Sequence, residues 1–107
     1  MNKENKIRQI ERTKSFIEDH FQQYKNYERD SRCATRKKDR ERASENMSVH
    51  IKYIEDSLGN PLIYSIIDSG QQFQFELFER YVDTDVPKYL KQIEIFLEEL
   101  KSEMQEE

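Results

Sequence analysis

The sequence contains few of the residues that interrupt helices or form covalent cross-links. Its 107 residues include two glycines, two prolines, one cysteine and no tryptophan. Because Gly and Pro end helices and strands, their scarcity favours a few long elements over many short ones. The single cysteine, Cys33, allows neither an internal disulfide nor a cysteine metal cluster.

Long apolar stretches are absent as well. No run of 18 apolar residues occurs, which predicts that the chain has no transmembrane helix. The first residues, MNKENKIRQIERTKS, lack the apolar core of a signal peptide. We therefore expect a cytoplasmic protein without a membrane partner.

The rest of the composition predicts a domain with a small hydrophobic core. Charged residues make up 37% of the chain and the net charge is −4, a composition that leans toward disorder. Against this, the chain has six Tyr and six Phe, which each bury a large area. We expect a single helical domain over 1–107 whose small core is completed by self-association, as in a homodimer.

Two segments of the first half carry apolar side chains at helical spacing. The first runs from about residue 3 to at least Tyr27, and the second covers roughly 38–58, up to a stop at Gly59. Steps of three and four residues return to the same side of a helix, so each segment predicts an amphipathic helix. The expected buried faces are Ile7, Ile10, Ile17, Phe21 and Tyr24 in the first helix and Ala43, Met47, Ile51, Ile54 and Leu58 in the second.

The C-terminal segment has the most regular pattern. We expect Thr84 or Asp85 to cap a last helix with Pro87 in its first turn, because these residue types are common at helix starts. The apolar residues beyond the cap have the heptad-like spacing of a coiled-coil seam. This seam consists of Val86, Leu90, Ile93, Leu97, Leu100 and Met104.

The stretch 61–82 allows two interpretations. Asn60 and Pro61 are typical of the cap and first turn of a third helix, whereas Phe73, Phe75 and Leu77 alternate as they would in a strand. Helical neighbours offer a hairpin little to pair with, which favours the helix. We therefore predict an all-α fold, a small antiparallel bundle of about four helices, with an α+β fold containing a hairpin at 62–78 as the alternative.

The segment 29–42, RDSRCATRKKDRER, concentrates positive charge. It holds seven Lys or Arg against three acids, a net charge of +4 (7 − 3), in a chain that is −4 overall. With few apolar residues it is expected to be weakly packed, and it either continues the first helix or follows a break near Asp30–Ser31. In a continuous helix, Arg29, Arg32, Arg36 and Arg40 would share one face. The predicted charge-based contact residues are Arg29, Arg32, Arg36, Lys37, Lys38 and Arg40.

A second set of predicted contact residues is aromatic. The aromatic residues near 61–89 exceed what one face of two short elements can bury, so some are expected to be exposed. Exposed aromatic side chains often anchor a protein partner. The predicted anchors are Phe73, Phe75, Phe78 and Tyr81.

Catalytic and metal-binding motifs were tested by residue spacing. Glu-x-x-His pairs require an acid three residues before each histidine, but Ile17 precedes His20 and Met47 precedes His50. No His-x-x-x-His pair or Gly-rich phosphate loop occurs. We expect no enzymatic activity, cofactor or metal, with His20 at a helix interface and His50 on a polar flank.

These patterns favour a non-catalytic adaptor, regulator or inhibitor that binds a macromolecular partner, most often a protein. Short, charged chains without motifs are common among phage and mobile-element accessory proteins. The alternative is a nucleic-acid-binding accessory subunit that uses the segment 29–42, although its three acids and the net charge of −4 oppose general nucleic-acid affinity.

Overall fold

The computed structural model describes residues 2–67 and 82–106. Four helices occur in these ranges: α1 (Lys3–Cys33), α2 (Lys37–Leu58), α3 (Pro61–Tyr64) and α4 (Val82–Glu106). The described residues contain no strand, which confirms the predicted all-α fold. None of these helices is long and apolar enough to cross a membrane.

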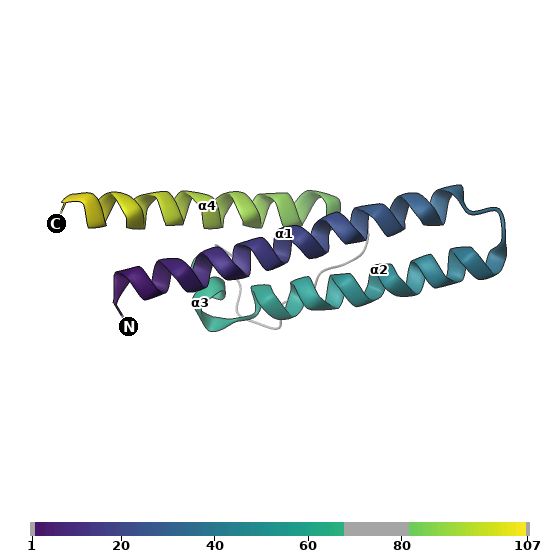
Figure 1. The fold of residues 1–107 in the computed structure, drawn as a ribbon, viewed down its shortest axis with the longest axis horizontal. Coiled ribbons are helices and arrows are strands. Elements are labelled where there is room, and N and C mark those ends of the chain that lie inside the picture. Colours follow the sequence, from purple (N-terminus) through teal and green to yellow (C-terminus); the bar gives the residue numbers. More distant parts are fainter. Residues whose placement is uncertain (1, 68–81, 107) are drawn as a thin grey trace.

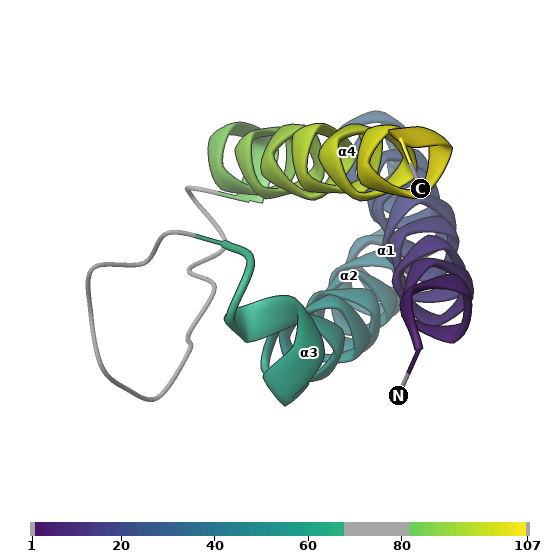
Figure 2. The same cartoon turned by 90° about the vertical axis from the view of Figure 1, so that its left-hand side faces the viewer.

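Helix α1 forms the centre of an elongated molecule. It packs against α2 on one side and against α4 on the other, and both neighbours run antiparallel to it (Figure 1). The end-on view shows that α2 and α4 lie at an angle around α1, with α3 beside α2 (Figure 2). The molecule measures 59 × 26 × 20 Å, so its two ends are well separated.

Helix α1 extends beyond Tyr27, the residue that its apolar pattern predicts it to reach at least, and ends at Cys33. Asn2 caps it by accepting a hydrogen bond from the Asn5 backbone N–H at 2.8 Å. At the other end, the Ala34 N–H still bonds to the Asp30 carbonyl at 2.9 Å, and the backbone of Ala34 is extended. The break therefore follows Cys33 instead of occurring at Asp30–Ser31, since Gly and Pro are both absent there and Ala34 is the first residue to leave helical geometry.

The core is formed by one stripe from each long helix. Ile10, Ile17 and Tyr24 of α1 recur every seven residues and are almost fully buried, as are Ile54 and Leu58 of α2. Burial of each such side chain stabilises the fold by roughly 1.5–3 kcal/mol. Val86, Ile93, Leu97 and Leu100 of the α4 seam are buried and Leu90 is partly buried. The last expected member, Met104, is 36% exposed because it lies near the end of α4.

The predicted start of the last helix is wrong. Val82 already belongs to α4, ahead of both expected caps, Thr84 and Asp85. Val82 and Val86 lie one turn apart and are both fully buried, so packing favours helical geometry before the expected caps. Pro87 consequently lies inside the helix, where it removes the backbone N–H that would bond to the carbonyl of Asp83.

The predicted opening of a third helix is confirmed. The Asn60 side chain accepts a hydrogen bond from the Leu62 N–H at 2.9 Å, and Pro61 occupies the first turn. Because 62–64 is helical, the first strand of the alternative hairpin does not form. The remainder of that alternative lies outside the described residues, as do the predicted aromatic anchors Phe73, Phe75, Phe78 and Tyr81.

Candidate functional site at the α1–α2 hairpin

Residues 29–42 form the tip of the α1–α2 hairpin, here called the basic tip. It comprises the end of α1, the connection 34–36 and the start of α2. This tip projects beyond the first turn of α4, at the end of the molecule opposite the chain termini (Figure 1). All six predicted contact residues are exposed: Arg29, Arg32, Arg36, Lys37, Lys38 and Arg40.

The expected four-arginine stripe along one continuous helix does not form. Arg29 and Arg32 belong to α1, Arg36 is the N-cap residue of α2, and Arg40 lies in α2. The extended backbone of Ala34 and Arg36, with ψ values of 132° and 135°, interrupts the helix between the two pairs. The structure instead gathers cations from two antiparallel helices at one end of the molecule.

Few of these cations are neutralised within the tip or by the residues beside it. Arg32 lies 3.4 Å from Glu28 and Lys37 lies 3.9 Å from Glu41, both one helical turn away. In the part of the chain that the structure describes, Arg29, Arg36, Lys38 and Arg40 have no ion pair. The two exposed ion pairs contribute little to stability and are easily exchanged for other contacts. The paired and unpaired cations of the tip are therefore all available to a partner.

The start of α2 carries positive charge, which is unfavourable at a helix N-terminus. The helix dipole places partial positive charge there, yet Arg36, Lys37 and Lys38 occupy the cap and first two positions. The Arg36 side chain makes no capping hydrogen bond, and Asp39 is the one acid of the first turn. The dipole and the cations together make this end of α2 strongly attractive to anions.

The acidic end of α4 does not reach the basic tip. Glu94, Glu98, Glu99 and Glu103 belong to the C-terminal half of α4, and this half extends toward the opposite end of the molecule (Figure 1). Ion pairs there join α4 to the beginning of α1, with Lys3 3.6 Å from Glu103 and Lys101 3.5 Å from Glu11. The positive and negative ends are therefore separated along the 59 Å axis and do not neutralise each other within one chain.

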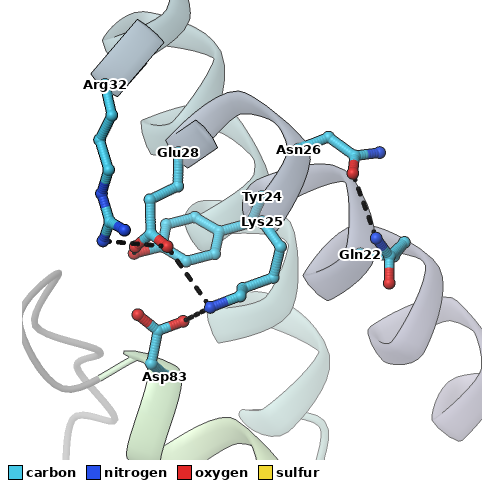
Figure 3. Close-up of polar contacts among 7 residues, drawn as sticks. All are labelled: Gln22, Tyr24, Lys25, Asn26, Glu28, Arg32 and Asp83. Carbon is cyan, nitrogen blue, oxygen red and sulfur yellow. Dashed lines mark hydrogen bonds and ion pairs between the residues drawn. The ribbon is translucent and has the colours of Figure 1, made fainter. Parts of the chain in front are cut away.

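A polar cluster fixes the start of α4 at the base of the tip (Figure 3). The Lys25 ammonium donates to Asp83 of α4 at 2.8 Å and to Glu28 at 3.4 Å. Glu28 also accepts from the Tyr24 hydroxyl at 3.2 Å and lies 3.4 Å from Arg32. The hydrogen bond to Asp83 is the main reason that the pKa of Lys25 is raised above its ordinary value.

The two histidines meet across the interface of α1 and α2. Their Nδ1 atoms are 2.7 Å apart, although 30 positions separate His20 from His50 in the sequence. Aromatic rings surround them, with Phe16 and Tyr53 against His20 and Tyr27 stacked on His50. The predicted interface position of His20 is confirmed, whereas the polar-flank position of His50 is wrong because its ring points to α1.

The half-buried position of His50 affects its protonation. Burial lowers its pKa below the ordinary value, and the positive charge that His20 would carry lowers it further. The neutral form of His50 is therefore favoured at neutral pH. The spacing tests examined motifs within one helix and could not detect a pair formed between two helices.

An exposed aromatic surface lies beside the histidine pair. Phe16 of α1 is 41% exposed and Tyr53 of α2 is 47% exposed, and their rings meet edge to face at 6.2 Å. Both line an open groove of about 420 Å³, together with Arg12, Thr13, Asp56, Ser57 and Asn60. Neither Phe16 nor Tyr53 belongs to the expected buried faces, and the sequence pattern did not indicate that their rings would meet.

Comparison with known proteins finds no match for this chain among protein-family models, curated proteins or solved structures. The chemistry of the described residues is therefore the basis for assigning a function.

Proposed function

We propose that the protein is a non-catalytic cytoplasmic adaptor, regulator or inhibitor whose basic tip binds an acidic surface of a protein partner. The observation that carries this proposal is the projecting set of cations at 29–42, most of which have no ion pair among the described residues. Because these cations lie on two helices, they form a positively charged surface instead of a single row along one helix. Such a surface accelerates association with an oppositely charged partner and sets its orientation.

The composition of the tip contributes little to folding, which supports a role in binding. Three cations at the start of α2 oppose the helix dipole, and a capping side chain is absent at Arg36. A sequence optimised for stability alone would have Ser, Asp or Asn at that position. The unfavourable charge placement is consistent with selection for an anionic partner.

A protein fits this surface better than a nucleic acid does. Asp30, Asp39 and Glu41 interrupt the positive charge and would repel a regular phosphate backbone. The exposed rings of Phe16 and Tyr53 lie on the same hairpin and supply the aromatic anchors that protein interfaces use. The accessory proteins of phages and mobile elements remain the class in which we place this chain.

The second candidate is nucleic-acid binding, which the cations around the α2 N-terminus favour. A helix N-terminus combined with Lys and Arg is a good phosphate-binding arrangement. Retention on DNA, RNA and heparin at low salt distinguishes this candidate, because phosphate contacts weaken steeply as salt rises.

The proposal is tested by affinity purification from native cells with matched charge reversals. Arg36→Glu/Lys38→Glu changes the tip, and Lys88→Glu/Lys91→Glu changes exposed residues of α4 by the same net charge. We expect the wild type and the α4 variant to recover the same protein, and the tip variant to lose it. Equal recovery by both variants would contradict the proposal. Recovery that depends on nuclease-sensitive material would support the nucleic-acid candidate.

A further inference from the structure

His20 of α1 and His50 of α2 share a hydrogen bond in the middle of the hairpin. Their Nδ1 atoms are 2.7 Å apart and both side chains are half-buried. At this distance one proton lies between the two nitrogens, so one Nδ1 donates and the other must offer a lone pair. The contact therefore exists only while at least one of the two rings is neutral.

Protonation of both rings is incompatible with this contact. An imidazolium carries hydrogen on both of its nitrogens, so two of them would direct N–H groups and positive charges at each other across 2.7 Å. The second proton, taken up from water, occupies the lone pair that had accepted the hydrogen bond. Repulsion between like charges thereby replaces a hydrogen bond between two helices.

The neighbouring side chains of α1 and α2 offer no carboxylate to compensate a second positive charge. One helical turn from either histidine, the side chains are all uncharged. They are Phe16, Ile17, Gln23 and Tyr24 on α1, and Asn46, Met47, Tyr53 and Ile54 on α2. Tyr27, which stacks on His50, is a phenol and stays neutral in acid. Asp19, next to His20 in sequence, is exposed and lies about 100° around α1 from it.

Within the described residues, the other two helices direct their charges elsewhere. Helix α3 contains no charged residue. On α4, the charged residues that follow the Asp83 contact are Asp85 and Lys88, and both act on Tyr89 of their own helix. The Lys88 ammonium lies 5.8 Å from the centre of the Tyr89 ring, and the pKa of Tyr89 is raised by burial and by Asp85. Burial and His20 account for the lowered pKa of His50.

The histidine pair lies between two parts of the α1–α2 interface that bury unequal amounts of apolar surface. Toward the base of the hairpin, α2 buries Ile54 and Leu58 completely. Toward the basic tip, it buries Met47 and the small side chain of Ala43. Because less apolar surface holds the outer part together, loss of the contact between the histidines affects that part first.

We propose that the His20–His50 pair is a pH-sensitive switch in the α1–α2 hairpin. Mild acid places a proton on both rings, breaks the Nδ1–Nδ1 contact and loosens the hairpin from the pair outward to the basic tip. Return to neutral pH restores the contact. The arrangement of the tip cations on two helices thus depends on the protonation of a pair that lies further down the hairpin.

The direction of the pH effect on stability follows from the lowered pKa of His50. The unfolded chain binds this proton at a higher pH than the folded protein does. The stability associated with neutral His50 is therefore complete above the ordinary pKa of 6.5 and is lost as the pH falls through the lower pKa of the folded state.

Thermal unfolding between pH 7.5 and pH 5 tests the switch in the wild type and in the His20→Gln/His50→Gln double variant. Titration of the carboxylates is common to both proteins and cancels in the comparison. The wild-type midpoint should fall by about 4–8 °C relative to the variant, the shift expected for loss of one net hydrogen bond. Lys52→Gln, an exposed change on α2, should follow the wild type. Equal pH dependence of the wild type and the double variant would overturn the proposal.

Hydrogen exchange shows where the molecule loosens. After correction for the intrinsic effect of pH, amides of 24–33 and 37–50 in the wild type should exchange about fivefold faster at pH 5, as expected for loss of one net hydrogen bond. Amides of 91–104 in α4 should keep their protection, and the double variant should show no such change. Unchanged exchange near the tip, or an equal increase in α4, would contradict the switch.

NMR of the imidazole nitrogens tests the switch in the wild type, without dependence on the folding of a variant. Both rings should become fully protonated over the pH range in which exchange rises. A pair that keeps its hydrogen bond at pH 5, or that protonates without any rise in exchange, would overturn the proposal. Circular dichroism at pH 7.5 establishes whether the variants fold. In His20→Gln, the pKa of His50 should rise, because His20 contributes to lowering it.

Discussion

Individual polar contacts attach α4 to α1, and Lys25 makes the most direct of them. It is bonded to Asp83, 58 positions away, and to Glu28 on its own helix. Glu28 has a side chain only 14% exposed and contacts Tyr24 and Arg32 as well. The sequence shows each of these charges, but it does not indicate that Lys25 and Asp83 meet, because that depends on how far α4 is shifted along α1.

The raised pKa of Lys25 leads to a prediction for alkaline pH. Because the folded protein holds this proton more tightly than the unfolded chain, its contribution to stability is complete below the ordinary pKa of 10.5. It is lost as the pH rises through the higher pKa of the folded state. The contribution is small because the Lys25 side chain is 43% exposed, so water screens the ion pair.

Urea denaturation at a series of pH values checks this prediction. The free energy of unfolding of the wild type should exceed that of Lys25→Gln by a constant, small amount between pH 8 and 10. This difference should shrink as the pH rises above 10.5. A difference that grows with pH would contradict it, and Lys52→Gln serves as a control for loss of an exposed lysine.

At the scale of helices, the connection between α1 and α2 determines the form of the basic tip. A continuous helix would have arranged Arg29, Arg32, Arg36 and Arg40 along one face. The turn at 34–36 divides them between antiparallel helices. Local signals for this turn are weak, since Gly and Pro are both absent from 29–42. The reversal allows the apolar faces of α1 and α2 to pack, which is a tertiary effect.

The N-cap of α2 provides a prediction that separates stability from binding. Arg36→Asp should increase the free energy of unfolding by about 1 kcal/mol, because Asp accepts a hydrogen bond from the first turn and has the charge that the dipole favours. The same change should weaken partner binding by removing a cation from the tip.

Arg36→Ala is the matched control, because it removes the cation without adding a cap. It should weaken binding while leaving the free energy of unfolding nearly unchanged. Chemical denaturation measures the stability of both variants, and pull-down of the partner measures binding. Stabilisation by Ala equal to that by Asp would show that loss of charge, and not capping, is responsible.

At the scale of the whole molecule, charge and apolar surface are unevenly distributed. The basic tip and the acidic part of α4 occupy opposite ends of the 59 Å axis. Between them, the exposed side chains of Phe16, Val49 and Tyr53 lie on α1 and α2. An exposed apolar surface of this kind is typical of a contact site and supports the prediction of a homodimer.

Light scattering at high micromolar concentration tests self-association. We expect a dimer for the wild type and dissociation for Tyr53→Glu, because a carboxylate would be buried without a partner at the interface. Ile95→Glu on α4 is a suitable control, since Ile95 and Tyr53 are both 47% exposed. A wild-type monomer at this concentration would show that the prediction is wrong.

The sequence by itself determined the helical character of α1, α2 and α4, the Asn60–Pro61 helix start, most of the buried seams and which segments are basic or acidic. These features depend on residues within a few positions of one another, through helical periodicity and capping. The tertiary structure alone decided that His20 meets His50, that Lys25 reaches Asp83 and that the two charged ends lie far apart. Such contacts depend on the register and direction of helix packing, which side chains distant in sequence establish together.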